Sequence, residues 1–420
     1  MDAPAPIPEL APVDTPFAEA DCRRFVIAFV NRTLIALLAL AAFNVTVDPY
    51  GAFGVHLVPA ESRTGDSRTA RAEMLRRFTG KTVLIGSSRT RVGYDGSLPG
   101  LPGGPALNVG LDGTHLHELA LAVEQAARNP HIRRIVLSLD WHLLDAKWKP
   151  NSDFQCSRFN PDRNHFEHFC DLLWNGRSIE ASIRALRRWK PSPTPQHDCY
   201  GFAVNAGLRF NRTPQSIRTR TTLAQYVGDE GYLQDLQPVE SIPPLLDRMI
   251  RVCRDREIEL TVVIDPVHCL LLEGLHVRNG WERYREWKSL LVQTASDAGV
   301  AVWDFTGYHP WTTEPLLDES SPAKSQWFWE PSHMRRELGD RILRRILGVD
   351  PHDETFGEQL TPDRLDNHFA RIDRERLKWI ATSPRESHSL AQLLRTRPDS
   401  AASPSPPATL ATRENGSANR

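Results

Sequence analysis

The sequence predicts an α/β domain built on a doubly wound parallel sheet. Five short apolar runs rich in Val, Ile and Leu are separated by stretches with helical spacing, the pattern of repeated strand–helix crossovers. Each run ends in or is followed by glycine or aspartate, which are typical turn residues. We therefore predict a five-stranded sheet with strands at residues 82–85, 106–110, 135–139, 260–264 and 300–303.

Length and charge bound the class of protein. A chain of 420 residues with 40% hydrophobic and 25% charged side chains can bury a large core and carry extensions or a second domain. The 51 basic and 52 acidic residues give a formal net charge of -1, so we do not expect nucleic acid as a partner.

The amino-terminal region predicts a tail followed by a membrane anchor. Residues 1–22 are rich in Pro, Ala and acidic side chains, which favours disorder. Residues 23–47 are long and apolar enough to cross a bilayer as a helix, although Arg32 lies inside and would have to snorkel, so the embedded part narrows towards residues 33–47. A buried helix of a soluble domain and a cleaved signal peptide are the alternatives.

Charge asymmetry predicts the orientation of this anchor. Arg23, Arg24 and Arg32 lie on its amino-terminal side, whereas Asp48 follows it. Because basic residues stay on the cytoplasmic side, residues 1–22 are expected in the cytoplasm. The main domain would then lie on the periplasmic side of an inner membrane that the chain crosses once.

The domain is predicted to cover residues 48–348, with an insertion at residues 143–240. The strands alternate with predicted helices at residues 63–78 (on the surface), 115–127, 242–254, 281–298 and 334–347. The insertion breaks this pattern with aromatics, proline clusters and an amphipathic piece at residues 179–189, so we expect a subdomain or a lid over the site.

The carboxyl-terminal region predicts a helical extension over residues 349–382, with a helix at 361–380, and a disordered tail at 383–420. Two of the six cysteines, Cys253 and Cys269, flank a predicted strand and are expected in the core. Pairing among the other cysteines stays open, and no cysteine spacing resembles a zinc site.

The first predicted strand ends in Gly86-Ser87-Ser88-Arg89, a turn at the carboxyl edge of the sheet. In open α/β sheets ligands bind beyond that edge, and a serine there, backed by the amides of a following helix, is placed to act as a nucleophile. Ser88 is the candidate. The alternative is that the turn hydroxyls only cap the next helix.

A possible base for this serine lies some 240 residues later. Glu330-Pro331-Ser332-His333 follows the last strand, and an acid three residues before a histidine can orient the imidazole while its other nitrogen faces a serine. A salt bridge at a helix start would give the same pattern.

Together these motifs resemble the SGNH, or GDSL-like, hydrolase superfamily over residues 48–348, and especially membrane-anchored bacterial members related to D-alanyl-lipoteichoic acid and alginate O-acetylation proteins. Gly86-Ser87-Ser88 matches the family's Gly-Asp-Ser and Glu330-Pro331-Ser332-His333 its Asp-x-x-His. The resemblance implies an SGNH or flavodoxin-like fold and a triad of Ser88, His333 and Glu330.

The resemblance also implies an oxyanion hole. The amides of Ser88 and Gly110 match two of its donors. The family's third block, Gly-x-Asn-Asp, appears here as Ser138-Leu139-Asp140-Trp141, without the donor asparagine. A charged Asp140 would oppose an oxyanion, so the indole N–H of Trp141 is a candidate replacement.

A second acid-and-histidine pair follows the fourth strand. Asp265 and His268 have the same spacing as Glu330 and His333, but they do not follow the last strand. We rank this pair second and expect it in the substrate pocket with Arg89, Asn108 and Asp140, with a structural histidine as the alternative for His268. Arg89 would hold an anionic substrate group or form a structural salt bridge.

The function this predicts is a membrane-anchored serine esterase or O-acyltransferase that acts on acyl esters of a cell-envelope or exopolysaccharide glycan, without a metal or another cofactor. Its partners would be an acylated glycan or small acyl donor, the inner membrane and a membrane-bound acyltransferase. The alternative is a catalytically inactive glycan-binding or scaffolding subunit of a polysaccharide modification or secretion complex, in which tryptophans supply stacking surfaces.

Overall fold

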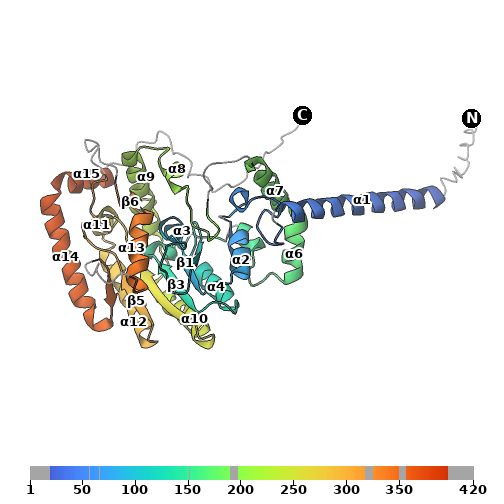
Figure 1. Cartoon of the computed structure of the whole chain (residues 1–420). Coiled ribbons are helices and arrows are strands. Elements are labelled where there is room, and N and C mark those ends of the chain that lie inside the picture. The colour runs from blue at the N-terminus through green and yellow to red at the C-terminus, as the bar shows by residue number, and fades with distance from the viewer. Residues whose placement is uncertain are drawn as a thin grey trace, which may run out of the picture.

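The computed structural model describes residues 19–55, 57–65, 67–150, 152–189, 197–316, 325–349 and 356–395. A long helix, α1 (Glu19–Val47), projects from one side of an α/β domain that holds the rest of the described chain (Figure 1). This helix begins four residues before the predicted anchor, and the first 18 residues of the predicted tail lie outside the described residues.

The domain is built on a six-stranded sheet with the strand order β2-β1-β3-β4-β5-β8. The five predicted strands are confirmed and run parallel, with bounds β1 (Thr82–Gly86), β2 (Ala106–Gly110), β3 (Arg134–Leu139), β4 (Glu259–Ile264) and β5 (Ala301–Asp304). The sixth strand, β8 (Glu358–Leu360), is antiparallel and was not predicted, because its three residues contain no apolar run.

The strand order decides where a ligand can bind. The chain moves from β1 outward to β2 and then returns to the other side of β1 with β3, so the crossovers change direction beside β1. In open parallel sheets the crevice beyond the carboxyl ends at such a switch point is the usual ligand site. The turns after β1, β2 and β3 meet there.

Helices cover both faces of the sheet, since every residue of β1 and β2 is buried. On one face α10 packs against both α4 and α12, and on the other α13 packs against α3. The helices of the domain proper are α2 (Arg68–Arg77), α3 (Ser88–Gly93), α4 (Leu116–Ala127), α10 (Ile242–Asp255), α11 (Cys269–Val277), α12 (Trp281–Asp297) and α13 (Arg336–Ile346). The predicted helices at 115–127, 242–254 and 281–298 are confirmed within about one residue, and Cys253 and Cys269 are buried as expected.

The prediction of a surface helix at residues 63–78 is wrong. Helix α2 begins at Arg68 and is largely buried. Its charged side chains pair inside the protein: Arg68 forms a buried ion pair with Glu118 at 2.6 Å, and Glu73 accepts from His168 Nε2 at 2.9 Å. Polar composition was misleading here because buried charges are tolerated when they are paired.

The insertion does not form one lid. Helices α5 (Ser152–Cys156), α6 (His165–Trp174) and α7 (Gly176–Arg188) belong to its first half, and α6 and α7 pack against α1. The second half contains α8 (Ala206–Phe210) and α9 (Gln215–Val227), and α9 contacts strand β6 near the candidate site. Only the second half of the insertion, with α8 and α9, therefore lies beside the candidate site, where the lid was expected.

The carboxyl-terminal extension is longer than predicted. Helix α14 (Leu365–Thr382) is followed by α15 (Pro384–Arg395), so residues 384–395 are helical where disorder was expected. Ile372 and Leu390 are fully buried against the domain, which explains why this segment folds. The remainder of the predicted tail lies outside the described residues.

One helix in the described part of the chain is long and apolar enough to cross a membrane. It covers Asp21–Val47 near the amino terminus. Its first half is fully exposed, whereas Asn44 and Val47 near its end are buried against the domain.

Candidate active site

Ser88 is the first residue of α3 and follows the carboxyl end of β1 directly after the turn. Ser87 is the amino-terminal cap of this helix: its hydroxyl accepts from the amide of Arg89 at 3.3 Å. The capping role that was weighed for the turn hydroxyls therefore falls to Ser87, and Ser88 is left to point elsewhere. The first amides of a helix have no acceptor within the helix, so the Ser88 N–H is available at this turn.

His333 and Glu330 lie on a small antiparallel hairpin and not at a helix start. Its strands are β6 (Phe328–Glu330) and β7 (His333–Met334), in which Glu330 pairs with His333. The two-residue connection, Pro331-Ser332, explains the spacing of three between acid and base. The carboxylate of Glu314 holds the incoming strand, since Oε1 accepts from the amides of Trp327 and Phe328 at 2.9 and 2.7 Å.

The structure brings the three predicted catalytic residues into one chain of hydrogen bonds. Ser88 Oγ lies 2.8 Å from His333 Nε2, and His333 Nδ1 hydrogen-bonds Glu330 Oε1. Because Nδ1 faces a carboxylate, which only accepts, it carries the proton and leaves Nε2 as the acceptor for the Ser88 hydroxyl. This is the arrangement that a serine nucleophile needs.

The environment of Glu330 keeps it ionised. Burial alone would raise its pKa, but the adjacent His333 and the amide of Ser332, which donates to Oε2 at 2.9 Å, lower that pKa below its ordinary value. Glu330 is almost fully buried, whereas the His333 side chain is 20% exposed. The charged carboxylate therefore lies inside, and part of the imidazole is open to solvent.

The amide N–H of Gly110, the predicted oxyanion donor, already has a hydrogen-bond acceptor in this structure. Its amide donates to Asn108 Oδ1 at 2.9 Å, while Asn108 Nδ2 donates to the carbonyl oxygens of Thr90 and Tyr94, each at 2.7 Å. Asn108 is thus a fully buried tie between β2 and α3 and not a pocket residue. Gly110 lies so close to α3 that a Cβ there would be 2.3 Å from the amide nitrogen of Arg91.

Arg89 and Asp140 form a buried salt bridge, which is the structural alternative foreseen for Arg89. The second oxygen of Asp140 accepts from the hydroxyl of Ser87 at 2.9 Å. Both side chains are almost fully buried, so the Asp140 charge is compensated where the family resemblance led us to expect a bare carboxylate. Arg89 also donates from Nε to the carbonyl of Ser332 at 2.8 Å, which ties the serine turn to the hairpin of the histidine.

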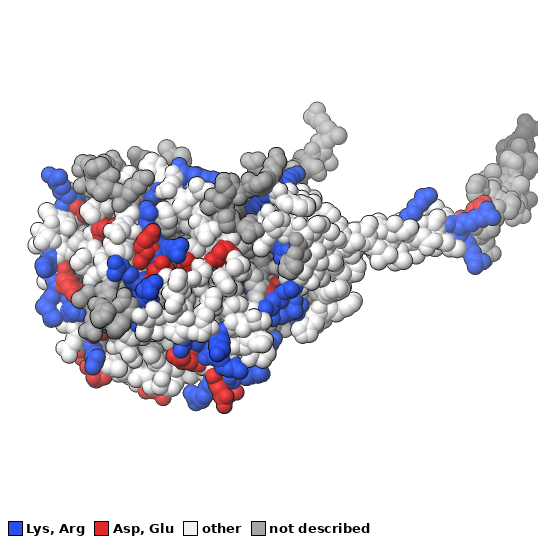
Figure 2. All heavy atoms as spheres, viewed as in Figure 1, with Lys and Arg blue, Asp and Glu red and all other residues white. Residues whose placement is uncertain are grey.

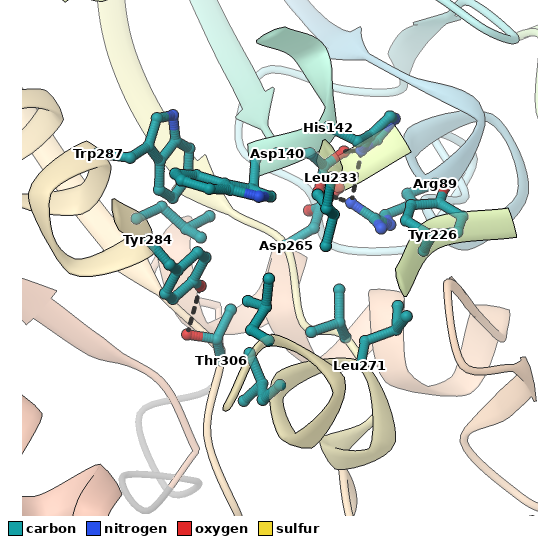
Figure 3. A pocket seen from close by; sticks show the side chains of 15 residues that line it. Arg89, Asp140, His142, Tyr226, Leu233, Asp265, Leu271, Tyr284, Trp287 and Thr306 are labelled. Carbon is teal, nitrogen blue, oxygen red and sulfur yellow. Dashed lines mark hydrogen bonds and ion pairs between the residues drawn. The ribbon is translucent and has the colours of Figure 1, made fainter. Parts of the chain in front are cut away.

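Beside this salt bridge lies a pocket with about 420 Å³ of empty space, part of it open to solvent (Figure 3). Arg89, Asp140, His142 and Asp265 gather at one end, and Tyr284 and Trp287 lie towards the other. Neither Ser88 nor His333 lines it. Trp141 does, and packs edge-on against Tyr284 and Trp287 at centroid distances of 5.6 and 5.9 Å. The structure thus places Trp141 in this pocket and gives it no contact with the serine among the described residues.

The second acid-and-histidine pair does not form a dyad. Asp265 accepts from the Tyr94 hydroxyl at 2.5 Å, and burial together with the nearby Asp140 raises its pKa to about 7. His268 is completely buried, donates from Nε2 to the carbonyl of Glu314 at 2.6 Å and caps α11 through Nδ1. Burial lowers the pKa of His268 to about 4. His268 is a structural residue outside the pocket, whereas Asp265 lines it.

Several residues around the base carry no signal in the sequence. Phe210 of α8 lies over His333 with ring centroids 5.5 Å apart and stacks on Trp329 at 5.3 Å. Tyr226 of α9 accepts from the Ser332 hydroxyl at 2.8 Å. Both come from the insertion, which has no readable pattern, so nothing in the sequence pointed to them.

Within the described residues there is no cluster of three or more His, Cys, Asp or Glu side chains that could hold a metal ion. The chain also matches no protein-family model and no curated protein. The chemistry of the site therefore has to be argued from its geometry.

Proposed function

We propose that this protein is a membrane-anchored serine esterase or O-acyltransferase of the SGNH type. The observation that carries the proposal is the hydrogen-bonded chain from Ser88 through His333 to Glu330. These residues come from opposite ends of the domain, yet they meet at the carboxyl edge of the sheet, where ligands of such folds bind.

In the proposed reaction, His333 Nε2 removes the hydroxyl proton as Ser88 Oγ attacks an ester carbonyl. Glu330 stabilises the resulting imidazolium and holds its orientation. The protonated imidazole then gives its proton to the leaving alcohol, and the acyl group remains on Ser88. A water molecule or a sugar hydroxyl, deprotonated in turn by His333, would take the acyl group and restore the enzyme.

The proposed substrate class is an acyl ester of a cell-envelope or exopolysaccharide glycan. The rings of Phe210 and Trp329 stack on each other, and Phe210 lies beside His333, where its ring would form an apolar wall for a bound substrate. A membrane anchor on α1 would keep the site close to envelope polymers or to a membrane-bound acyltransferase that supplies the acyl group. The arginine asymmetry supports an orientation with the domain outside the cytoplasm, and the periplasmic side of an inner membrane is the proposed location.

A second candidate function is a catalytically silent glycan-binding or scaffolding subunit. Two observations favour it. The Gly110 amide is occupied by Asn108, and Asp140 with its salt bridge stands where a donor asparagine is expected. Losing one oxyanion donor typically costs about 2.7–4 kcal/mol in the transition state.

Labelling of the full-length protein in detergent with a fluorophosphonate probe separates the two functions. An esterase should bind the probe covalently at Ser88, whereas a scaffold should not react. Peptide mass spectrometry would locate the adduct. Hydrolysis of small acetyl esters, with and without a glycan acceptor, would then distinguish hydrolysis from acyl transfer.

A further inference from the structure

The first half of the insertion presents apolar side chains beside the point where α1 leaves the domain. On α6 and just after α7, four aromatic residues are between 38 and 75% exposed, and two aliphatic residues on α7 are 37 and 40% exposed. We call this set the α6/α7 apolar surface: Phe166, Phe169, Trp174, Ile183, Leu186 and Trp189. Large exposed apolar side chains gathered in one place mark an interaction site.

Figure 1 shows α6 and α7 on either side of the end of α1, on the side of the domain from which that helix projects. In Figure 2 the same part of the domain carries few charged side chains, whereas charges are scattered over the rest of the visible face. The α6/α7 apolar surface thus adjoins α1 in a part of this face that carries few charges.

The junction between α1 and these helices is fixed. The side chain of Asn44 is fully buried; its amide donates to the carbonyl of Leu173 at 2.8 Å, and its oxygen accepts from the Ser182 hydroxyl at 2.7 Å. Further out along α1, the indole N–H of Trp174 donates to the carbonyl of Leu37 at 3.0 Å. Because α1 cannot turn freely on the domain, the depth of α1 in a bilayer sets the depth of α6 and α7.

That depth follows from the length of the helix. Leu37 comes 13 residues after Arg24, which is about 20 Å of helix at 1.5 Å per residue. A hydrocarbon core is about 30 Å thick, so with Arg24 at its cytoplasmic edge Leu37 is still inside the outer leaflet. This placement leaves Arg32 inside the core, where its side chain has to snorkel to the cytoplasmic headgroups. Trp174 is hydrogen-bonded to Leu37, so when the apolar part of α1 is in the bilayer, Trp174 and its neighbours are in the bilayer as well.

We infer that the α6/α7 apolar surface is seated in the outer leaflet of the membrane beside α1, and that its partner is lipid. Helix α7 has the composition of an interfacial helix: Ile183 and Leu186 are exposed on one side, and the exposed Arg177 and Arg187 lie near its two ends, where their long side chains can reach lipid phosphates. Tryptophans such as Trp174 and Trp189 are typical of the membrane interface. The inference rests on the membrane-spanning role proposed for α1 and is independent of catalysis at Ser88.

Photo-crosslinking of the full-length protein in lipid nanodiscs tests this. The crosslinking amino acid p-benzoylphenylalanine would replace Phe166, which is 75% exposed, or one of two control residues of similar exposure. Ile35, 65% exposed on α1, reports whether α1 is in the bilayer, and Leu377, 63% exposed on the distant helix α14, reports background. All three sites are exposed, so the fold should tolerate the change.

We expect lipid adducts by mass spectrometry at position 166 at least about tenfold above those at position 377, as for residues at a membrane interface. Adducts at position 35 but not at 166 would overturn the inference and leave the anchor intact. Adducts at 166 to a second copy of the chain or to another membrane protein would also overturn it, because lipid is the proposed occupant. Absence of lipid adducts at position 35 would show that α1 is not in the bilayer, and would overturn both the proposed anchor and the inference.

Discussion

Arg89 donates from its Nε to the carbonyl oxygen of Ser332 at 2.8 Å, and this bond links the serine turn to the hairpin of the histidine. Arg89 follows Ser88 directly, and Ser332 precedes His333, so each partner adjoins one member of the Ser88–His333 pair. The same guanidinium forms the buried salt bridge with Asp140 at the end of β3. Arg89 thereby joins three segments that are far apart in the sequence: the serine turn, the hairpin that carries His333, and the end of β3.

The first prediction separates the two neighbouring serines. Replacement Ser88→Ala should abolish fluorophosphonate labelling with little loss of stability, because within the described residues His333 is the one hydrogen-bond partner of the hydroxyl. Replacement Ser87→Ala should preserve labelling but lower the free energy of unfolding by about 1–2 kcal/mol, since it removes both a helix cap and a donor to Asp140. Probe labelling and chemical denaturation measure the two effects. Equal labelling of wild type and Ser88→Ala would rule out Ser88 as the nucleophile.

The second prediction concerns the acid of the triad. In Glu330→Gln the side-chain amide can donate to His333 Nδ1 and favour the wrong tautomer, so kcat for a small ester should fall by roughly 10³–10⁴-fold with KM nearly unchanged. His333→Ala should be at least as severe. As a matched control, Asp265→Asn alters the other acid-and-histidine pair and should leave the rate within a few fold. A larger fall in kcat for Asp265→Asn than for Glu330→Gln would mean that Asp265 and His268, and not Glu330 and His333, are the catalytic acid and base.

The third prediction tests whether position 140 is a missing oxyanion donor. Asp140→Asn restores the residue type that the family resemblance implies, but it removes the carboxylate that pairs with the buried Arg89 charge. We expect no gain in labelling rate and a loss of about 3–5 kcal/mol in the free energy of unfolding. An increase in labelling rate with unchanged stability would mean that position 140 faces the substrate and not Arg89.

The fourth prediction follows from the buried carboxyl of Glu73. Burial would raise its pKa, but His168, Arg158 and Arg76 outweigh burial and lower the pKa to about 2 from 4.5. The stability this contributes is fully present above about pH 4.5 and is lost as the pH falls towards 2, a change of about 3 kcal/mol. Glu73→Gln should flatten the acid limb of the stability curve measured by urea denaturation.

The control for this experiment is Glu259→Gln. Glu259 forms an exposed pair with Arg134 at 2.8 Å, and its side chain is 60% exposed, so little stability should depend on its charge. If both variants change the acid limb alike, Glu73 is not responsible for it.

The fifth prediction concerns topology. A reporter fused after Arg420 should be active only outside the cytoplasm, and one fused before Met1 only inside it, because Arg23, Arg24 and Arg32 lie at the amino-terminal side of α1. Alkaline phosphatase and green fluorescent protein fusions measure the two sides. The opposite pattern would reverse the proposed orientation, and two cytoplasmic ends would remove the anchor.

The sequence by itself determined the sheet and the order of its parallel strands along the chain. Runs such as residues 82–85 and 135–139 are almost entirely apolar, as is typical of strands buried on both faces, and their turns marked Ser88 and Asp140 at one edge. The acid-and-histidine spacing of Glu330 and His333 was equally readable. These features are local, so a single segment carries the whole signal.

Tertiary structure alone decided what those residues meet. Asp140 is neutralised by Arg89, the Gly110 amide is taken by Asn108, and Phe210 comes from the insertion to cover His333. None of these contacts joins neighbours in the sequence. Each depends on side chains from separate elements competing for the same buried donors and acceptors, and the outcome of that competition is fixed only when the elements pack.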